Sequence, residues 1–397
     1  MVYLSARAAF QNSQLLDPAF YDLSDGRLLR SPHFGLFTFP RGVVVNTPGV
    51  GDQPMTVFGG SRFVFGVDGL ASSGTITTLL HGAGSGDAFS HLNWAITGLS
   101  VDLPTLQTAI ASGQVLEMII VVGGMLSGND VFRLSNDDDR ANGYSGNDVL
   151  IGNGGNDWLF GDNGNDRIVG GTGQDLMSGG ADNDRYYVDD PFDSVQEYET
   201  QSDLFRDMGG YDQVYSTVSF SLSVGRSGTY VEGLKLVGSA DIDGRGNSSN
   251  NVLVGNDGAN GLTGVDGADV LKGMGGSDRL RGGAGSDKLF GGVGADTFLF
   301  DDWDRVTPSL DTIYDFSRAE NDRIDVSGVD ADVTNKGTND TFIWIGDAVF
   351  HGQPGELRVA HTVRNTLVQL DCDGNGVADL TIRLSGLVAL QEMDFVL

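Results

Sequence analysis

Aspartate recurs at a fixed interval of nine residues in two parts of this chain. Seven aspartates follow one another in this register in the first part and four in the second: Asp130, Asp139, Asp148, Asp157, Asp166, Asp175 and Asp184, then Asp269, Asp278, Asp287 and Asp296. An apolar residue such as Leu150 or Leu289 keeps the same period, two positions after each of them. Stacked carboxylates repel one another, and carboxylate oxygens are preferred ligands of Ca²⁺. These eleven aspartates are therefore candidate metal ligands.

The complete repeat unit reads G-G-x-G-x-D-x-U-x, where U is apolar, and it is intact at residues 170–178, 282–290 and 291–299. Its six glycine-rich residues suit a turn with positive φ angles, and the three residues around U suit a short strand. Two units close one coil, and successive coils stack their strands in parallel. The pattern predicts a mainly all-β fold, a parallel β-roll or β-solenoid. The apolar residues fill a narrow interior, and the carboxylates line both edges beside exposed turn carbonyls.

Two other interpretations of the glycine-rich segments account for less of the sequence. A flexible linker explains one copy of the unit, but it does not explain eleven aspartates in register with an apolar partner. A nucleotide-binding loop needs a long strand before it and a helix after it, and the sequence indicates neither. The repeat alone accounts for the glycines.

The unit resembles the nonapeptide repeat of the RTX (repeats-in-toxin) proteins, whose parallel β-roll binds Ca²⁺ between turns. The resemblance implies several bound Ca²⁺ ions, each shared by turns that lie two repeat units apart in the sequence. It pairs Asp130/Asp148, Asp139/Asp157, Asp148/Asp166, Asp157/Asp175, Asp166/Asp184, Asp269/Asp287 and Asp278/Asp296. Five positions depart from the pattern: Asp137 and Asp182 replace glycine, Ala141 is a small core residue, and Asn251 and Asn260 are neutral. Sites that include these positions are expected to be weaker or empty.

The composition agrees with a turn-rich, cation-binding chain. Its 397 residues include 60 Gly and a strong excess of Asp over Glu, and the formal net charge is −30. That charge disfavours nucleic acid and anionic membrane surfaces as partners. The hydrophobic fraction of 40% is sufficient for a core. The single cysteine, Cys372, excludes a disulfide framework.

Charge and motif distribution predict five segments. These are residues 1–125, a small β-rich domain of unknown role; 126–190, the first array of repeats; 191–245, a strand-rich spacer; 246–300, the second array; and 301–397, a C-terminal cap. In the first segment the strand-like runs are 34–39, 42–45, 55–58 and 62–65, with a short helix over 105–111 behind Pro104. A continuous solenoid and two rolls joined by a spacer both fit residues 190–250, and the sequence favours one elongated body.

The C-terminal part resembles the C-terminal domain of serralysin-type secreted metalloproteases. Residues 291–298, 311–316 and 322–330 carry this resemblance. It implies a β-roll capped by a β-sandwich, and it implies that the ending Asp394-Phe395-Val396-Leu397 belongs to an uncleaved signal for type I secretion. The other interpretation of this ending is a last strand.

Features of the chain's beginning agree with export by the type I secretion machinery. The N-terminus has no readable signal peptide, and the most apolar segment, 118–122, is too short to cross a bilayer. We therefore expect an extracellular, secreted protein without a cleaved N-terminal signal peptide and without a transmembrane segment.

A second acidic motif lies near the C-terminus. The run from Asp371 to Gly376, with Asp379 beyond it, matches the opening of an EF-hand loop, but Ile382 stands at the twelfth position, where an acid is expected. The favoured interpretation is a turn between two strands of a hairpin. Leu380 and Leu384 alternate with polar residues around Ile382, as in a strand buried on one side.

No catalytic motif stands out. The five histidines form no His-Glu-x-x-His pair, and no Gly-x-Ser-x-Gly elbow occurs. His81 and His91 are ten residues apart, which is no recognised ligand spacing. The sequence leaves the question of an enzyme open but favours a binding role for residues 1–125, of an adhesin or matrix type, toward an extracellular glycan or protein. The alternative is a secreted enzyme, active on polysaccharides or esters, with an unrecognised site in that segment.

Overall fold

The structure, a computed structural model, describes residues 42–45, 54–65, 71–85, 88–102, 128–134, 136–197, 209–223, 230–306, 309–335 and 339–397. For residues 42–102 it describes the backbone alone. The chain divides into two units, Met1–Gly210 and Tyr211–Leu397. The structure confirms the predicted fold class, because almost every described element is a strand and the repeats form a parallel roll.

Two sheets make up the described part of the first unit. The first contains, in order of pairing, β1 (Gly42–Val45), β2 (Pro54–Phe65), β3 (Ala71–Ser85), β4 (Ala88–Asp102), β5 (Val131–Arg133), β7 (Val149–Gly154), β9 (Arg167–Thr172) and β11 (Arg185–Val188). The second contains β6 (Arg140–Asn142), β8 (Trp158–Asn163), β10 (Leu176–Ala181) and β12 (Ser194–Gln196).

The strands before the first array are antiparallel and differ in part from the prediction. The predicted run 42–45 is β1, but the runs 55–58 and 62–65 belong to one strand, β2, which carries a register shift at Gly59/Gly60. Glycines placed at a bulge let the strand continue where a turn was expected. The predicted run 34–39 and the predicted helix over 105–111 lie outside the described residues.

From β5 to β12 the first unit is a parallel roll. Strands on the same side pair two repeat units apart, so that Leu150 lies opposite Ile168 on one sheet and Leu159 opposite Met177 on the other. All four side chains are fully buried. One coil therefore consists of two nine-residue units, as the period predicts, and the apolar position of each unit fills the interior.

The described part of the second unit also contains two sheets. The first runs β13 (Gln213–Ser216), β15 (Gly233–Leu236), β17 (Val252–Val254), β19 (Val270–Gly275), β21 (Lys288–Val293), β23 (Thr312–Ile313), β28 (Leu380–Ser385), β27 (Asn365–Asp371), β26 (Glu356–His361) and β25 (Ile343–Trp344). The second runs β14 (Phe220–Ser221), β16 (Gly244–Arg245), β18 (Gly261–Asp266), β20 (Arg279–Ala284), β22 (Thr297–Asp301), β24 (Arg323–Gly328) and β29 (Phe395–Val396).

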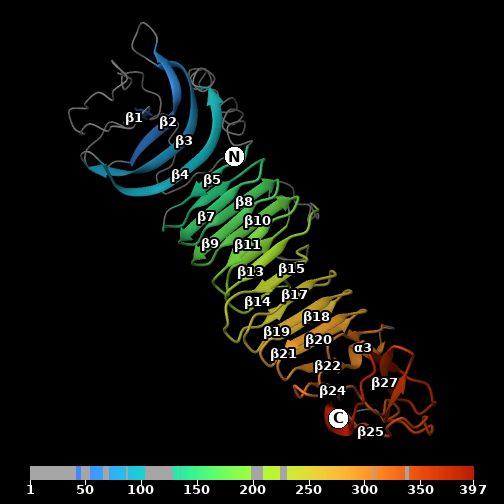
Figure 1. The fold of residues 1–397 in the computed structure, drawn as a ribbon. Coiled ribbons are helices and arrows are strands. Elements are labelled where there is room, and N and C mark those ends of the chain that lie inside the picture. The colour runs from blue at the N-terminus through green and yellow to red at the C-terminus, as the bar shows by residue number, and fades with distance from the viewer. Residues whose placement is uncertain are drawn as a thin grey trace. The chain divides into compact units, whose positions relative to one another are not determined.

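Most of the segment predicted as a spacer is itself part of a roll. Strands β13 to β16 pair in parallel with one another and with the strands of the second array. Figure 1 shows β17, β19 and β21 of this roll side by side. Within the second unit, the continuous-solenoid interpretation therefore holds from residue 213 onward.

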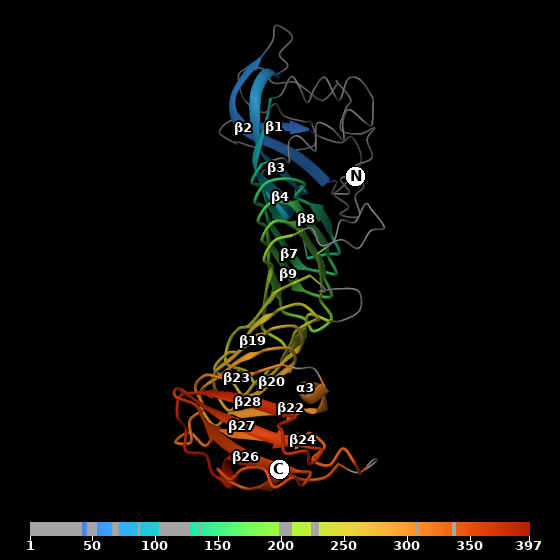
Figure 2. The ribbon, with the colours of Figure 1, turned by 90° about the vertical axis from the view of Figure 1, so that its right-hand side faces the viewer.

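The C-terminal part extends the roll, and the predicted β-sandwich cap is not confirmed. β28 pairs in parallel with β23, and β27 and β26 follow it as an antiparallel meander; Figure 2 shows these four strands in succession. A short helix, α3 (Asp302–Val306), precedes β23, and a 3-10 turn, η3 (Glu392–Asp394), precedes β29. The chain end is thus a last strand, which pairs with β24 and buries Phe395.

Candidate metal centre

The aspartates of each array form a ladder of hydrogen bonds along the roll. In nine of the eleven aspartates one carboxylate oxygen, Oδ1, accepts the backbone N–H of the residue at the same position one coil earlier. The acceptor–donor pairs are Asp148–Asp130, Asp157–Asp139, Asp166–Asp148, Asp175–Asp157, Asp184–Asp166, Asp269–Asn251, Asp278–Asn260, Asp287–Asp269 and Asp296–Asp278, with N···O distances of 2.7–2.8 Å. The structure therefore brings together, one coil apart, each pair that the RTX resemblance implied.

The second carboxylate oxygen of most ladder residues is buried without a hydrogen-bond partner. This holds for Oδ2 of Asp148, Asp157, Asp166, Asp175, Asp269, Asp278, Asp287 and Asp296, and for both oxygens of Asp130. All nine residues are at most 2% exposed. Asp139 and Asp184 are buried in the same ladder. A buried carboxylate oxygen without a donor costs several kcal/mol in the folded state, on the order of 1–3 or more. A bound cation would compensate the charge of these buried oxygens.

In most repeat units, glycine at the first position leaves the space beside these oxygens. A Cβ added to Gly273 would collide with Oδ2 of Asp278 and with the carbonyl oxygen of Gly291, one coil further on. The same relation holds at Gly152 for Asp157 and the carbonyl of Gly170. Carboxylate and carbonyl oxygens thus converge on one small space. Oxygen-only donor sets of this kind fit Ca²⁺.

Burial makes these carboxylates hard to charge without a counterion. It raises the pKa of Asp148 and of Asp157 to about 7, although each accepts a backbone hydrogen bond that lowers its pKa. The pKa of Asp269 is raised to about 7 by burial first and then by the charges of Asp287 and Asp266. A divalent cation between the carboxylates would remove both penalties.

Substituting a glycine that lies beside a ladder carboxylate, such as Gly273, should weaken metal binding selectively. We expect Gly273→Ala to raise the Ca²⁺ concentration needed for folding by at least about tenfold, equivalent to ~1.4 kcal/mol, because the added methyl group occupies the space beside Asp278. The matched control is Gly275→Ala in the same strand, where an added Cβ meets nothing closer than 3.6 Å. Circular dichroism during Ca²⁺ titration measures the folding midpoint of both variants. Equal midpoints would contradict the assignment of the space beside Asp278 as a metal site.

Three further aspartates extend the ladder and were missed in the sequence. Asp193 stands nine residues after Asp184, in perfect register, and accepts the N–H of Asp175 at 2.9 Å. Asp311 accepts from Asp287 at 2.9 Å, and Asp322 accepts from Asp296 at 3.0 Å, across longer stretches of sequence than a regular coil spans. The nine-residue register identifies Asp193. The other two fall out of register because extra residues, including α3, lie within their coils.

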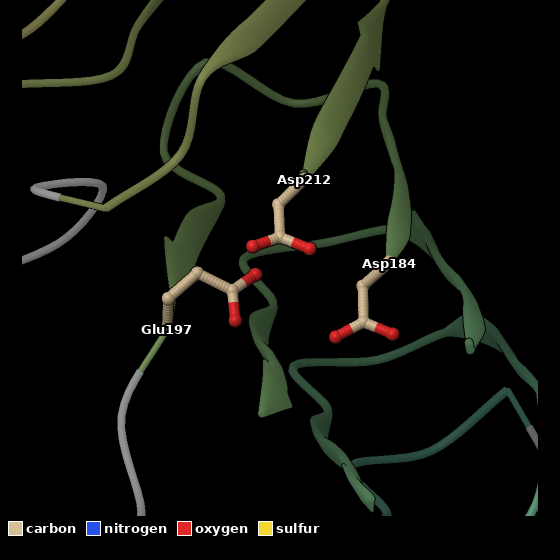
Figure 3. Close-up of side chains that lie close together, drawn as sticks. All are labelled: Asp184, Glu197 and Asp212. Carbon is tan, nitrogen blue, oxygen red and sulfur yellow. The ribbon is translucent and has the colours of Figure 1, made fainter. Parts of the chain in front are cut away.

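The last coil of the first unit carries an additional acid. Glu197 follows β12 and is buried, and its oxygens accept from the Tyr186 hydroxyl and from the N–H of Gly180. Figure 3 shows the carboxylates of Glu197 and Asp184 facing the same space, and oxygens of the two lie within 4.8 Å of each other. Glu197 stands two repeat units after Gly179, where a regular coil has a glycine.

The loop between β27 and β28 confirms the predicted hairpin. The two strands are antiparallel, and Asp371 accepts the N–H groups of Gly374 and Gly376 at 2.7 and 2.8 Å. Carboxylate oxygens of Asp371, Asp373 and Asp379 lie within 4.8 Å of one another. Their oxygens are already engaged with backbone N–H groups of the loop, so the geometry is that of a hydrogen-bonded turn.

Comparison with known proteins identifies the repeats. Residues 126–159, 134–168, 160–190 and 263–298 match the family model of the RTX calcium-binding nonapeptide repeat. Both arrays therefore contain RTX calcium-binding repeats, folded as a parallel β-roll, and Ca²⁺ is the ion they bind.

Two solved structures illustrate the similarity. The AlgE6R3 subunit of the mannuronan C5-epimerase from Azotobacter vinelandii is 30% identical; the match covers 40% of this chain and 80% of that one, with a TM-score of 0.27. The extracellular lipase LipA from Serratia marcescens is 17% identical over 67% of this chain and 40% of that one, with a TM-score of 0.22. No curated protein matches this chain. Within its described part, no helix is long and apolar enough to cross a membrane.

Proposed function

We propose that this protein is a secreted RTX protein whose two arrays fold when Ca²⁺ fills the spaces between stacked coils. The row of buried, unpartnered Asp Oδ2 atoms carries the proposal. In the proposed calcium sites, the eleven predicted aspartates, together with Asp193, Asp311 and Asp322, supply the carboxylate ligands. Glycine carbonyls such as that of Gly291 supply further oxygen ligands. The bound ion would neutralise the carboxylates and join neighbouring coils.

Calcium binding and folding then form one equilibrium. The ligands of one ion come from successive coils, two repeat units apart in the sequence, so the site does not exist in the unfolded chain. Extracellular calcium modules bind with dissociation constants of about 10⁻⁴–10⁻³ M. An array with such sites stays unfolded at cytosolic Ca²⁺ and folds outside the cell, which suits export through a type I secretion channel.

Removal of calcium tests the proposal. We expect an excess of EGTA to abolish the β signal that the two arrays contribute to the circular dichroism of the full chain, because uncompensated carboxylates line both arrays. Re-addition of millimolar Ca²⁺ should restore the signal, whereas Mg²⁺, which binds small octahedral sites and keeps its waters, should not. A spectrum that is the same in EGTA and in Ca²⁺ would contradict calcium-dependent folding.

We further propose that residues 1–125 bind an extracellular glycan or protein and that the arrays present them. The absence from the sequence of His-Glu-x-x-His and Gly-x-Ser-x-Gly motifs supports binding over catalysis. A glycan array probed with the calcium-loaded full chain tests this role. Retention on particular glycans supports it, and turnover of a polysaccharide or ester substrate would favour the enzyme alternative.

A further inference from the structure

Two coils at the start of the second array are closed by side-chain amides. Asn251 and Asn260 occupy the ladder position of the aspartates, and each donates its backbone N–H to the next member of the ladder. Both are buried. The Nδ2 of Asn260 donates to the carbonyl of Ile242 at 2.7 Å, and the Nδ2 of Asn251 donates to the carbonyl of Val231 at 3.0 Å.

The inward-facing oxygen of each asparagine is also satisfied. The Oδ1 of Asn251 accepts the N–H of Asn247, and the Oδ1 of Asn260 accepts the N–H of Asn256, both at 2.8 Å. In each case this oxygen lies beside the first glycine of the unit, at the place where Asp269 directs its unpartnered Oδ2 toward Gly264. The space that needs a cation in the aspartate units is therefore already hydrogen-bonded in the asparagine units.

The backbone of these turns differs accordingly. Asn247 and Asn256 hold the second position of their units, and neither has a positive φ. The equivalent Val265 and Met274 of the following coils have φ of 98° and 82°, a region that side-chain-bearing residues rarely adopt. Asn256 instead forms an Asx turn, accepting the N–H of Gly258 at 2.8 Å. The motif Gly-Asn-x-x-x-Asn thus replaces Gly-Gly-x-Gly-x-Asp with a relaxed, self-bonded turn.

The coils upstream have a core of their own. Val214, Leu222, Leu234, Leu253 and Leu262 are at most 1% exposed. Within the described residues between Asp184 and Asp269, no buried side-chain oxygen or nitrogen lacks a partner, in contrast to both arrays. The described residues between Gln213 and Leu262 therefore lack the electrostatic penalty that makes the arrays depend on an ion.

We propose that Asn251 and Asn260 make the described part of residues 213–262 a calcium-independent section of the roll, on which the second array assembles when Ca²⁺ arrives. The amide group of each asparagine joins neighbouring coils in place of an ion, because it donates hydrogen bonds to carbonyls of the preceding coil. The backbone N–H groups of Asn251 and Asn260 then offer ready partners for Asp269 and Asp278. Growth of the array from a preformed edge avoids the entropic cost of starting a new coil.

Hydrogen exchange of the full chain, followed by mass spectrometry in EGTA and in Ca²⁺, tests this inference, which rests on the proposed function. In EGTA we expect amides of residues 244–262 to exchange at least about tenfold more slowly than those of residues 266–298. In Ca²⁺ both segments should be protected. Equal, fast exchange of the two segments in EGTA would overturn the inference while leaving calcium-dependent folding intact. Equal protection of both in EGTA would contradict the proposed function itself.

Two variants sharpen the test. Asn260→Asp cannot donate to Ile242 and places a charge in the buried space, so protection of residues 255–262 should become calcium-dependent. Asn250→Asp is the matched control, because this exposed side chain uses only its oxygen, which accepts the N–H of Ala268 at 2.7 Å. The inference fails if protection in Asn260→Asp remains resistant to EGTA. If that variant does not fold in Ca²⁺, the wild-type comparison of the two segments decides.

Discussion

Asp166→Asn should destabilise the first array in Ca²⁺ and stabilise it in EGTA. Asp166 is 2% exposed; its Oδ1 accepts from Asp148 at 2.7 Å, and its Oδ2 has no partner. Burial, followed by nearby acids that include Asp148 and Asp162, raises the pKa of Asp166 to about 8. The neutral amide removes this charge from the ion-free chain, but it also removes a strong ligand from the loaded one.

The expected shift is large enough to measure in both directions. The Ca²⁺ midpoint for folding should rise by about tenfold or more, equivalent to ~1.4 kcal/mol, while residual β signal in EGTA should increase. Asp138→Asn is the control, since its carboxylate is exposed and its Oδ1 accepts from Asn156, a role that an amide oxygen keeps. A variant of Asp166 that is destabilised equally with and without Ca²⁺ would show a packing role alone.

Acid should partly replace calcium in folding the arrays. The pKa of Asp148 and the pKa of Asp278 are raised to about 7, first by burial, whereas an unfolded chain has Asp pKa values of about 3.9. Between these values the folded state binds more protons than the unfolded state, so folding stability rises as pH falls. This stabilisation is fully present below about pH 4 and is lost as pH rises through about 7.

Circular dichroism in EGTA between pH 8 and pH 4.5 measures this effect. The β signal should grow as the pH falls, with most of the change between about pH 7 and 5. In saturating Ca²⁺ the direction reverses, because protons compete with the ion for the same carboxylates. An ion-free chain that is least folded at pH 5 would contradict the electrostatic explanation.

The roll was predictable because one physical constraint repeats along the chain. An apolar residue every nine positions, such as Leu150, Leu159 and Ile168, can be buried only if alternate units face each other, which fixes a coil of two units. The same constraint places Asp148 one coil from Asp166. The second position tolerates Asp162 in place of glycine because aspartate enters the left-handed region more readily than most residues.

What the sequence did not reveal lies where the period fails. Asp311 and Asp322 join the ladder through coils of irregular length, and no spacing rule finds them. The parallel pairing of β23 with β28 joins Thr312 to Arg383, which are far apart in the sequence, so no local pattern predicts it. The β-sandwich cap that the serralysin resemblance implied is not confirmed. From the sequence, Asn251 and Asn260 are expected to give weaker or empty metal sites, because a sequence does not show which carbonyls an amide can reach.

Crystallography of the calcium-loaded protein, with anomalous scattering to identify the ions, tests the central claim most directly. We expect a Ca²⁺ ion at each buried Oδ2 of the ladder, such as that of Asp157 beside the carbonyl of Gly170, with Ca–O distances of about 2.3–2.6 Å. No ion should lie beside the amides of Asn251 and Asn260. Aspartate oxygens that bind only water or protein donors, with no anomalous signal between the coils, would contradict the assignment of these carboxylates as calcium ligands.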